Sequence, residues 1–467
     1  MELDRRIESY REDMIQSLQE LIRIRSVEGE PRENMPFGEG PYQALNYMLN
    51  LAKSMGFQTL NVDNYAGHID LGSGEETVGI LVHVDVVPEG EGWTYPPYGG
   101  EIHDGKIYGR GAIDDKGPAI AVLYAMKAIQ ESGLSISKKV RMILGTNEET
   151  NWEDIPYYLK RVKKPDLAFV PDADFPVIHG EKGILVLDLK KKLNQPSKGN
   201  LVLEKIQGGN APNMVPDACT AVLLVEGNIR QDVENILRNF VKETGWDLSL
   251  KDIGSGKVVI SSKGKSAHGS TPEKGINAIS QLMKFLGELP FEDCGVGEFI
   301  RIYNRHIGME YYGESIGCGF EDEISGKLIF NVGMIYVDEK EAAVTVNIRY
   351  PITISSQEVY PGMHQSLKDT GIEIIEQEDM KPIYIPEDHE LIQKLMQVYR
   401  EKTGDMKSKP IVIGGGTYAR AIENAVAFGP LFPGQPGVEH QKDEYISIDS
   451  LLQCAKIYAE AIYQLAK

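Results

Sequence analysis

The stretch Gly79-Ile-Leu-Val-His-Val-Asp-Val-Val-Pro88 decides the fold class of this 467-residue chain. It is short, almost wholly apolar and ended by a proline, which is typical of a strand buried on both faces of a parallel sheet. Two later apolar runs, residues 140–144 and 167–170, have the same character. Residues 117–129 lie between the first two runs and show a proline near the start followed by helical spacing of apolar residues. This alternation predicts an α/β domain with a mostly parallel sheet flanked by helices.

The character of the sequence changes near residue 181, where strand-like segments follow one another with few helices between them. This pattern predicts a second, α+β domain over residues 181–385. Helical periodicity returns over residues 391–399 and 451–465. The simplest organisation is therefore an α/β domain formed by residues 1–180 and 386–467, with the α+β domain inserted into it.

Composition and charge exclude several classes of function. Lysine and arginine number 49 against 69 aspartates and glutamates, so the net charge is −20 and the average surface repels nucleic acid. Residues 1–24 are highly charged and contain no apolar run of signal-peptide length, which predicts a cytoplasmic protein that does not bind membranes. Four scattered cysteines form no CxxC pair and indicate free thiols in a reducing compartment: Cys219, Cys294, Cys318 and Cys454.

His83 and Asp85 lie two residues apart near the end of the first predicted strand. Residues at this spacing in a strand point to the same face. A histidine that binds a metal ion commonly has its ring oriented by a nearby carboxylate. The pair therefore indicates a metal ligand and its orienting partner, although either residue alone is as consistent with an ordinary polar surface.

A glycine-rich turn, Gly109-Arg-Gly-Ala-Ile-Asp-Asp-Lys-Gly117, precedes the predicted helix. Such a turn can cradle a phosphate on its backbone amides, but Asp114 and Asp115 would repel that anion. Metal binding is the favoured interpretation, and a tight turn with aspartate as the helix N-cap is the structural alternative.

Adjacent acids follow the next strand in Gly145-Thr-Asn-Glu-Glu-Thr150. Because neighbours on an extended chain point apart, one carboxylate can bind metal while the other acts as general base. Further polar groups occur in Val170-Pro-Asp-Ala-Asp174 and in Gly437-Val-Glu-His440, which is followed by Glu444. Most of these motifs fall at the carboxyl ends of successive strands, where open α/β sheets hold their ligands.

The ordered set of motifs resembles the M20 family of metallopeptidases, and within it the bacterial aminoacyl-histidine (carnosinase-like) dipeptidases. The resemblance implies two divalent metal ions per chain, bridged by Asp114, with the ligands His83, Asp114, Glu149, Asp172 and His440. It implies Glu148 as general base and Asp85 as the residue that steers His83, and it implies a cis peptide between Asp114 and Asp115. Asp115 remains an alternative to Asp114 as the bridging ligand. The ligand set favours zinc and also suits manganese or cobalt.

The same resemblance makes residues 1–180 and 386–467 the catalytic domain and residues 181–385 a lid. Asn213, His268 and Arg349 of the lid would contact the substrate, with His268 stabilising the oxyanion and Arg349 binding a carboxylate. Thr417 and Arg420, in Gly414-Gly-Gly-Thr-Tyr-Ala-Arg420, are secondary candidates for substrate binding. The resemblance favours a monomer over a dimer.

The function that follows is a metal-dependent dipeptidase that hydrolyses the peptide bond of small, unblocked dipeptides. Alternatives within the family are an N-acyl amino acid deacylase and a tri- or carboxypeptidase. An alternative of another class is a non-catalytic protein that binds metal or peptide. A nucleotide-binding enzyme is disfavoured, because residues 264–266 lack the upstream glycine of a P-loop and only a GxGxxA match occurs, at residues 414–419.

Overall fold

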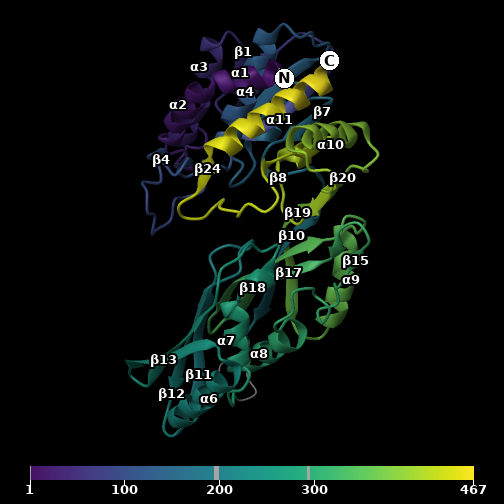
Figure 1. The fold of residues 1–467 in the computed structure, drawn as a ribbon. Helices are drawn as coiled ribbons and strands as arrows, with labels where there is room; N and C mark the ends of the chain where they lie inside the picture. The colour runs from purple at the N-terminus through teal and green to yellow at the C-terminus, as the bar shows by residue number, and fades with distance from the viewer. Residues whose placement is uncertain (1, 194–198, 292–294) are drawn as a thin grey trace. The chain divides into compact units, whose positions relative to one another are not determined.

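The computed structural model describes residues 2–193, 199–291 and 295–467 and divides the chain into two compact units (Figure 1). Unit 1 comprises Met1–Gly180, Tyr384–Ile411 and Gly416–Lys467. Unit 2 comprises Glu181–Ile383 and Val412–Gly415.

The short segment Val412–Gly415 differs from the sequence-based expectation, which includes it in the catalytic segment 386–467. Its carbonyl groups bind residues of unit 2. The carbonyl of Ile413 accepts the backbone N–H of Lys182 at 3.0 Å, and that of Gly414 accepts Nη1 of Arg349 at 3.0 Å. These hydrogen bonds join residues far apart in the sequence, so no local sequence pattern predicts them.

A nine-stranded mixed sheet forms the centre of unit 1. The order is β1-β2-β6-β3-β7-β22-β9-β20, with β21 also paired to β9. The central strands β6, β3, β7 and β22 run parallel, whereas β1, β2 and β9 pair antiparallel with their neighbours. The strands are β1 (Gln58–Val62), β2 (Ala66–Leu71), β3 (Thr77–His83), β6 (Lys139–Gly145), β7 (Leu167–Val170), β9 (Ile178–Glu181), β20 (Ile383–Tyr384), β21 (Ile411–Ile413) and β22 (Ala425–Ala427).

The α/β class is confirmed, and the parallel part of the sheet lies where the apolar runs predict it. All seven residues of β3 are buried, as expected for a strand covered on both faces. The strand ends at His83, however, so Asp85 lies beyond it and the argument from strand alternation does not apply to the pair. The reason is that the N–H of Val86 binds the carbonyl of Ser26, at 3.1 Å, instead of a neighbouring strand.

Helices α4 and α11 pack against each other and against β3 (Figure 1). Most residues of helix α4 are buried, as expected for a helix that is apolar on all sides. The helix ends at Gly133, which has a left-handed φ of 72°. The helices of unit 1 are α1 (Glu2–Ser9), α2 (Arg11–Ile22), α3 (Glu39–Ser54), α4 (Lys116–Ser132), α5 (Asp154–Leu159), α10 (Glu390–Thr403), η2 (Tyr418–Ala421) and α11 (Ile448–Ala466).

Two small sheets complete unit 1 and carry loops of interest. One joins β4 (Glu101–His103), β5 (Lys106–Tyr108) and β24 (Tyr445–Ser447). The other pairs β8 (Ala173–Asp174) with β23 (Pro430–Leu431) in parallel.

Unit 2 is an α+β structure built on an eight-stranded antiparallel sheet in the order β13-β14-β12-β11-β17-β18-β10-β19. Buried and more exposed residues alternate along β12, so one face of the sheet packs on the core. The strands are β10 (Gly183–Lys192), β11 (Leu201–Gly208), β12 (Ala218–Val225), β13 (Asp247–Gly254), β14 (Lys257–Lys263), β17 (Ile329–Val337), β18 (Glu341–Tyr350) and β19 (Ile372–Met380), with the short pair β15 (Glu321–Asp322) and β16 (Gly326–Lys327). The helices are α6 (Ile229–Thr244), η1 (Pro272–Lys274), α7 (Ala278–Leu286), α8 (Gly295–His306) and α9 (Ser356–Ser366).

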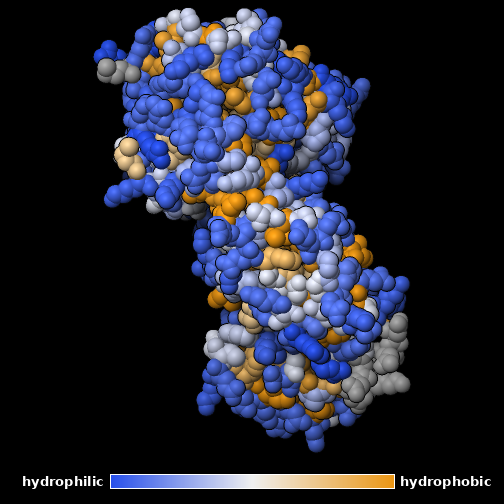
Figure 2. Space-filling model, turned by 90° about the vertical axis from the view of Figure 1, so that its right-hand side faces the viewer, coloured by the Kyte–Doolittle hydropathy of each residue, from blue (hydrophilic) through white to orange (hydrophobic). Residues whose placement is uncertain are grey.

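Hydrophilic residues predominate on the face shown in Figure 2, with hydrophobic residues interspersed. Among the described residues, none of the helices is both long enough and apolar enough to cross a membrane. Cys219, Cys318 and Cys454 are buried free thiols, and Cys294 lies outside the described residues.

His68 gives the stability of unit 1 a defined pH dependence. Its Nδ1 contacts the Tyr158 hydroxyl at 2.8 Å, while Asp70 beside it binds Arg141 through two hydrogen bonds of 2.7 Å. Burial and the positive charge of Arg141 lower the pKa of His68 to about 4, although Asp70 opposes the shift. The fold therefore favours the neutral ring, and the corresponding stability is complete above pH 6.5 and lost as the pH falls towards 4.

We expect the difference in unfolding free energy between wild type and His68→Gln to shrink by about 2 kcal/mol between pH 7.5 and pH 5. Denaturant unfolding at both pH values measures it. His103→Gln, at a half-exposed position, is the control. An equal difference at both pH values would contradict the assignment of a neutral His68.

Candidate metal centre

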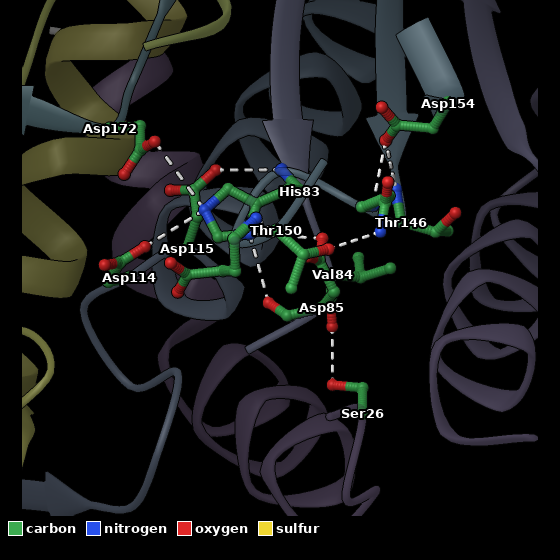
Figure 3. A network of polar contacts seen from close by, with 12 residues as sticks. Ser26, His83, Val84, Asp85, Asp114, Asp115, Thr146, Thr150, Asp154 and Asp172 are labelled. Atoms are coloured by element: carbon green, nitrogen blue, oxygen red, sulfur yellow. Dashed lines mark hydrogen bonds and ion pairs between the residues drawn. The ribbon is translucent and has the colours of Figure 1, made fainter. Parts of the chain in front are cut away.

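His83, the last residue of β3, stands at the centre of a group of acidic side chains (Figure 3). Its Nε2 lies 3.0 Å from Oδ1 of Asp114 and 3.6 Å from Oδ2 of Asp172. Asp114 belongs to the glycine-rich loop before α4, and Asp172 follows the parallel strand β7. The carboxyl end of the sheet therefore brings both acids to one histidine, as open α/β sheets do.

The carboxylate of Asp114 contacts two histidines, one through each oxygen. Oδ1 lies 3.0 Å from His83 and Oδ2 lies 3.0 Å from Nε2 of His440. His440 also lies 3.0 Å from a carboxylate oxygen of Glu149. The cluster thus has two poles, one with His83 and Asp172 and the other with His440 and Glu149, and Asp114 is shared between them.

The two histidines differ in exposure. The His83 side chain is 1% exposed, whereas that of His440 is 48% exposed. His440 has a left-handed backbone with φ of 60°, which is uncommon for a residue other than glycine and tends to occur at functional sites. Of the two histidines, His440 is therefore the one that solvent reaches.

Glu148 and Glu149 reach different parts of the cluster. Glu149 groups with His83 and Asp114, and Glu148 groups with His83 and Asp172, the ligand atoms of each group lying within 4.8 Å of one another. Glu149 additionally contacts His440, whereas Glu148 groups with Asp172 beside His83. The two residues lie in a turn and not on the extended chain that the sequence pattern suggested, yet their side chains reach different positions.

Like charges and burial make this cluster electrostatically costly. Burial and the nearby carboxylate of Asp114 raise the pKa of Asp172 to about 7. Burial, with the charges of Asp172 and Glu149, raises the pKa of Glu148 well above its usual range. The negative charge on each of these acids is unfavourable beside the others, and a bound cation would compensate this repulsion.

The histidines partly balance these charges. Burial alone would lower the pKa of His83, but hydrogen bonds with Asp114, Asp172 and Asp85 outweigh it and raise that pKa well above 6.5. Hydrogen bonds from both histidines lower the pKa of Asp114 against the effect of its burial. Histidine nitrogens and carboxylate oxygens converging within one small volume fit a divalent cation such as zinc, manganese or cobalt.

Asp85 lies on the other side of the His83 ring (Figure 3). Nδ1 of His83 is 3.0 Å from the backbone carbonyl of Asp85 and 3.5 Å from its Oδ1. The second oxygen, Oδ2, accepts the backbone N–H of Glu149 at 3.0 Å. Asp85 is therefore placed to orient His83 and to hold the loop that carries Glu149.

Asp115 takes a different position from Asp114, to which a cis peptide joins it. Its Oδ2 accepts the backbone N–H of His83 at 3.2 Å, and the residue is completely buried. Among the described residues, His440 forms ion pairs with Asp114 and Glu149, so Asp114 is the aspartate shared by the two histidines.

The sequence does not single out Asp154, which holds the turn before Glu148. Its carboxylate accepts the N–H groups of Thr146, at 2.7 Å, and Asn147, at 2.9 Å, and a hydrogen bond from the Tyr418 hydroxyl. Burial raises the pKa of Asp154 to about 6. An acid at the start of α5 was the only sequence signal, and it is indistinguishable from an ordinary residue of a helical first turn.

Three of the residues predicted to bind substrate lie in unit 2. The backbone carbonyl of Asn213 accepts the N–H of Gly269, at 2.7 Å, beside His268. His268 is exposed, and its Nδ1 lies 2.6 Å from the Ser270 hydroxyl. Unit 2 therefore brings Asn213 and His268 together.

Arg349 is 4% exposed and is held within unit 2. Its Nε donates to Oδ1 of Asn347 at 2.7 Å, and its Nη1 donates to the carbonyl of Gly414. A side chain added at Gly414 would approach Ser270 to within 2.8 Å, so this backbone lies next to the His268 segment. Arg349 and His268 thus border the same part of unit 2.

Thr417 and Arg420 lie in unit 1. The Thr417 hydroxyl caps η2 by accepting the N–H of Ala419 at 3.2 Å, and the residue is 3% exposed. A local capping role accounts for this contact.

The chain belongs to the peptidase family M20/M25/M40, whose model matches residues 79–464, and it is a hydrolase of that family. It is 41% identical over 462 residues to "Putative dipeptidase YtjP" of Bacillus subtilis (strain 168), covering 98% of each chain. This membership confirms the resemblance on which the site residues were predicted.

Solved structures share the fold. Human carnosine dipeptidase 1 matches with a TM-score of 0.60 at 14% identity, covering 99% of this chain and 98% of that one. The aminoacylhistidine dipeptidase of Vibrio alginolyticus matches with a TM-score of 0.54 at 16% identity, covering 97% and 96%. At these identities the likeness extends to the fold alone.

The geometry leads to a test that separates the two adjacent aspartates. Asp114→Asn should weaken divalent metal binding, because the shared carboxylate is lost. The loss of affinity should exceed the roughly 10- to 100-fold that is typical when a residue that only hydrogen-bonds a metal ligand is removed. Asp115→Asn is the matched control, since the same substitution leaves both Asp114 oxygens in place. Isothermal titration of chelator-treated protein measures both. If Asp115→Asn loses more metal affinity than Asp114→Asn, Asp114 is not the bridging ligand.

Proposed function

We propose that this protein is a dipeptidase that hydrolyses unblocked dipeptides at a site holding two divalent metal ions. The observation that carries the proposal is the shared Asp114 carboxylate, with His83 and Asp172 at one pole and His440 and Glu149 at the other. Each pole has an imidazole and carboxylate oxygens, which is a ligand set that zinc, manganese or cobalt accepts. The name of the 41% identical relative supports the substrate class.

Metal ions in these positions would polarise the scissile carbonyl and lower the pKa of a water molecule. Glu148 would take the proton of the attacking water and return it to the leaving amine. Its support is geometric, since it lies beside His83 and Asp172 while Glu149 is engaged with His440. Asp85 would keep Nε2 of His83 directed to the metal by binding the opposite nitrogen.

From unit 2 we propose His268 as the group that stabilises the oxyanion and Arg349 as the partner of the substrate carboxylate. Asn213, beside His268, is a third proposed contact, and Thr417 and Arg420 are secondary ones. Binding of a carboxylate close to the scissile bond would favour dipeptides, because a longer C-terminal extension moves that charge away. We further propose a monomer in the cytoplasm, with zinc as the metal.

The role of Glu148 leads to a direct test. Glu148→Gln should lower kcat by about 10²- to 10⁴-fold, because the amide cannot accept the proton, while the bound metal content stays unchanged. Glu153→Gln makes the same substitution at an exposed position of the same loop and should keep wild-type kcat. Steady-state kinetics and elemental analysis of both variants are the measurements. Full activity of Glu148→Gln would remove Glu148 as the base.

The substrate class requires a panel rather than a variant. Chelator-stripped protein, supplied in turn with zinc, manganese or cobalt, is assayed on dipeptides, dipeptide amides, tripeptides and N-acyl amino acids. We expect kcat/KM to be highest for dipeptides with a free carboxylate and at least about tenfold lower for their amides, since a charged hydrogen bond is lost. Preference for N-acyl amino acids or tripeptides would contradict the proposed dipeptide substrate. No amide cleavage with any metal would contradict the proposed hydrolytic activity.

A further inference from the structure

Glu444 is a buried acid next to the candidate metal centre, and the proposed reaction gives it no role. It is completely buried, four residues after His440 and directly before β24. Strand β24 pairs with β5 so that Tyr445 faces Tyr108. This register places Glu444 opposite Gly109, where the loop that carries Asp114 begins, and the N–H of Gly109 donates to the carbonyl of Glu444 at 2.9 Å.

The side chain of Glu444 binds the same loop at its other end. Its Oε1 accepts the backbone N–H of Ile113 at 3.0 Å and that of Asp114 at 3.3 Å. One residue thereby fixes both the start of the loop and the peptide unit of the shared carboxylate. We infer that Glu444 is a positioning residue that fixes the backbone of Asp114 relative to His440, so that the Asp114 carboxylate serves both poles of the metal centre.

Arg110 supplies the charge that this arrangement requires. Its Nη1 donates to Oε2 of Glu444 at 2.7 Å, and its guanidinium lies 5.2 Å from the ring centroid of Trp93. Nη2 also lies 3.4 Å from the carbonyl of Pro88 and 3.3 Å from that of Glu89, just beyond Asp85. The pair therefore ties together the chain after β3, the Asp114 loop and the His440 loop, while Arg110 compensates the extra negative charge.

A carboxylate suits this position because both of its ends must accept hydrogen bonds. A glutamine offers only one acceptor oxygen, which can serve either Arg110 or the two backbone amides but not both. The Glu444→Gln variant therefore releases one side of the clamp with little change in volume. This inference rests on the proposed metal site, so the test includes one readout with metal and one without.

With metal, we expect Glu444→Gln to bind zinc about 10- to 100-fold more weakly than wild type in at least one of two binding steps. Isothermal titration of chelator-treated protein with zinc alone is the measurement. The matched control is Asp70→Asn, which weakens the half-buried, doubly hydrogen-bonded pair of Asp70 on β2 and Arg141 on β6 in the nine-stranded sheet. It should retain wild-type zinc affinity. Wild-type affinity in Glu444→Gln, or an equal loss in Asp70→Asn, would overturn the inference.

Without metal, hydrogen exchange of residues 109–116 tests the clamp itself. The amides of Ile113 and Asp114 should be protected in wild type and exchange at least about tenfold faster in Glu444→Gln, because their acceptor is lost or shared. Should that variant not fold, the wild-type measurement alone decides, since unprotected amides at both positions would refute the clamp. If wild type shows protected amides but binds no zinc, manganese or cobalt, the proposed function fails while the clamp stands.

Discussion

The sharing of one carboxylate between two histidines is the interaction on which the rest of the site depends. Each oxygen of Asp114 lies 3.0 Å from a different imidazole, and the two histidines come from opposite parts of the sequence. His83 is fixed by the end of β3, whereas His440 lies in a loop that follows the short strand β23. The parallel strands of unit 1 thus position His83, and the C-terminal segment completes the cluster by supplying His440.

Burying several acids together constrains everything around them. The pKa of Asp172 rises to about 7 through burial and the charge of Asp114, so the acids are not stable as neighbouring anions without compensation. The structure supplies part of that compensation through the two histidines and leaves a ligand set suited to divalent ions. The same constraint accounts for Asp85 and Asp154, whose carboxylates accept backbone N–H groups and hold the loops in place.

Much of this could be predicted from the sequence because it depends on local patterns. The apolar runs fix the strands β3, β6 and β7, and the acids after them fall at one edge of the sheet. The position of Asp85 beyond the strand could not be predicted, because it depends on a hydrogen bond from Val86 to the distant Ser26. The role of Asp154 could not be predicted either, because it accepts backbone N–H groups of a nearby turn, which leaves no side-chain pattern in the sequence. That of Glu444 could not be predicted because the backbone N–H groups it accepts lie far away along the chain. The place of residues 412–415 in unit 2 could not be predicted either, because it depends on hydrogen bonds to the distant Lys182 and Arg349.

The most direct test of the account is anomalous diffraction from crystals of the protein loaded with zinc, recorded on both sides of the zinc absorption edge. The account predicts two peaks roughly 3.5–4 Å apart, one about 2 Å from each oxygen of Asp114, with His83 and Asp172 at one peak and His440 and Glu149 at the other. A single peak, or peaks bound by Asp115 in place of Asp114, would contradict it.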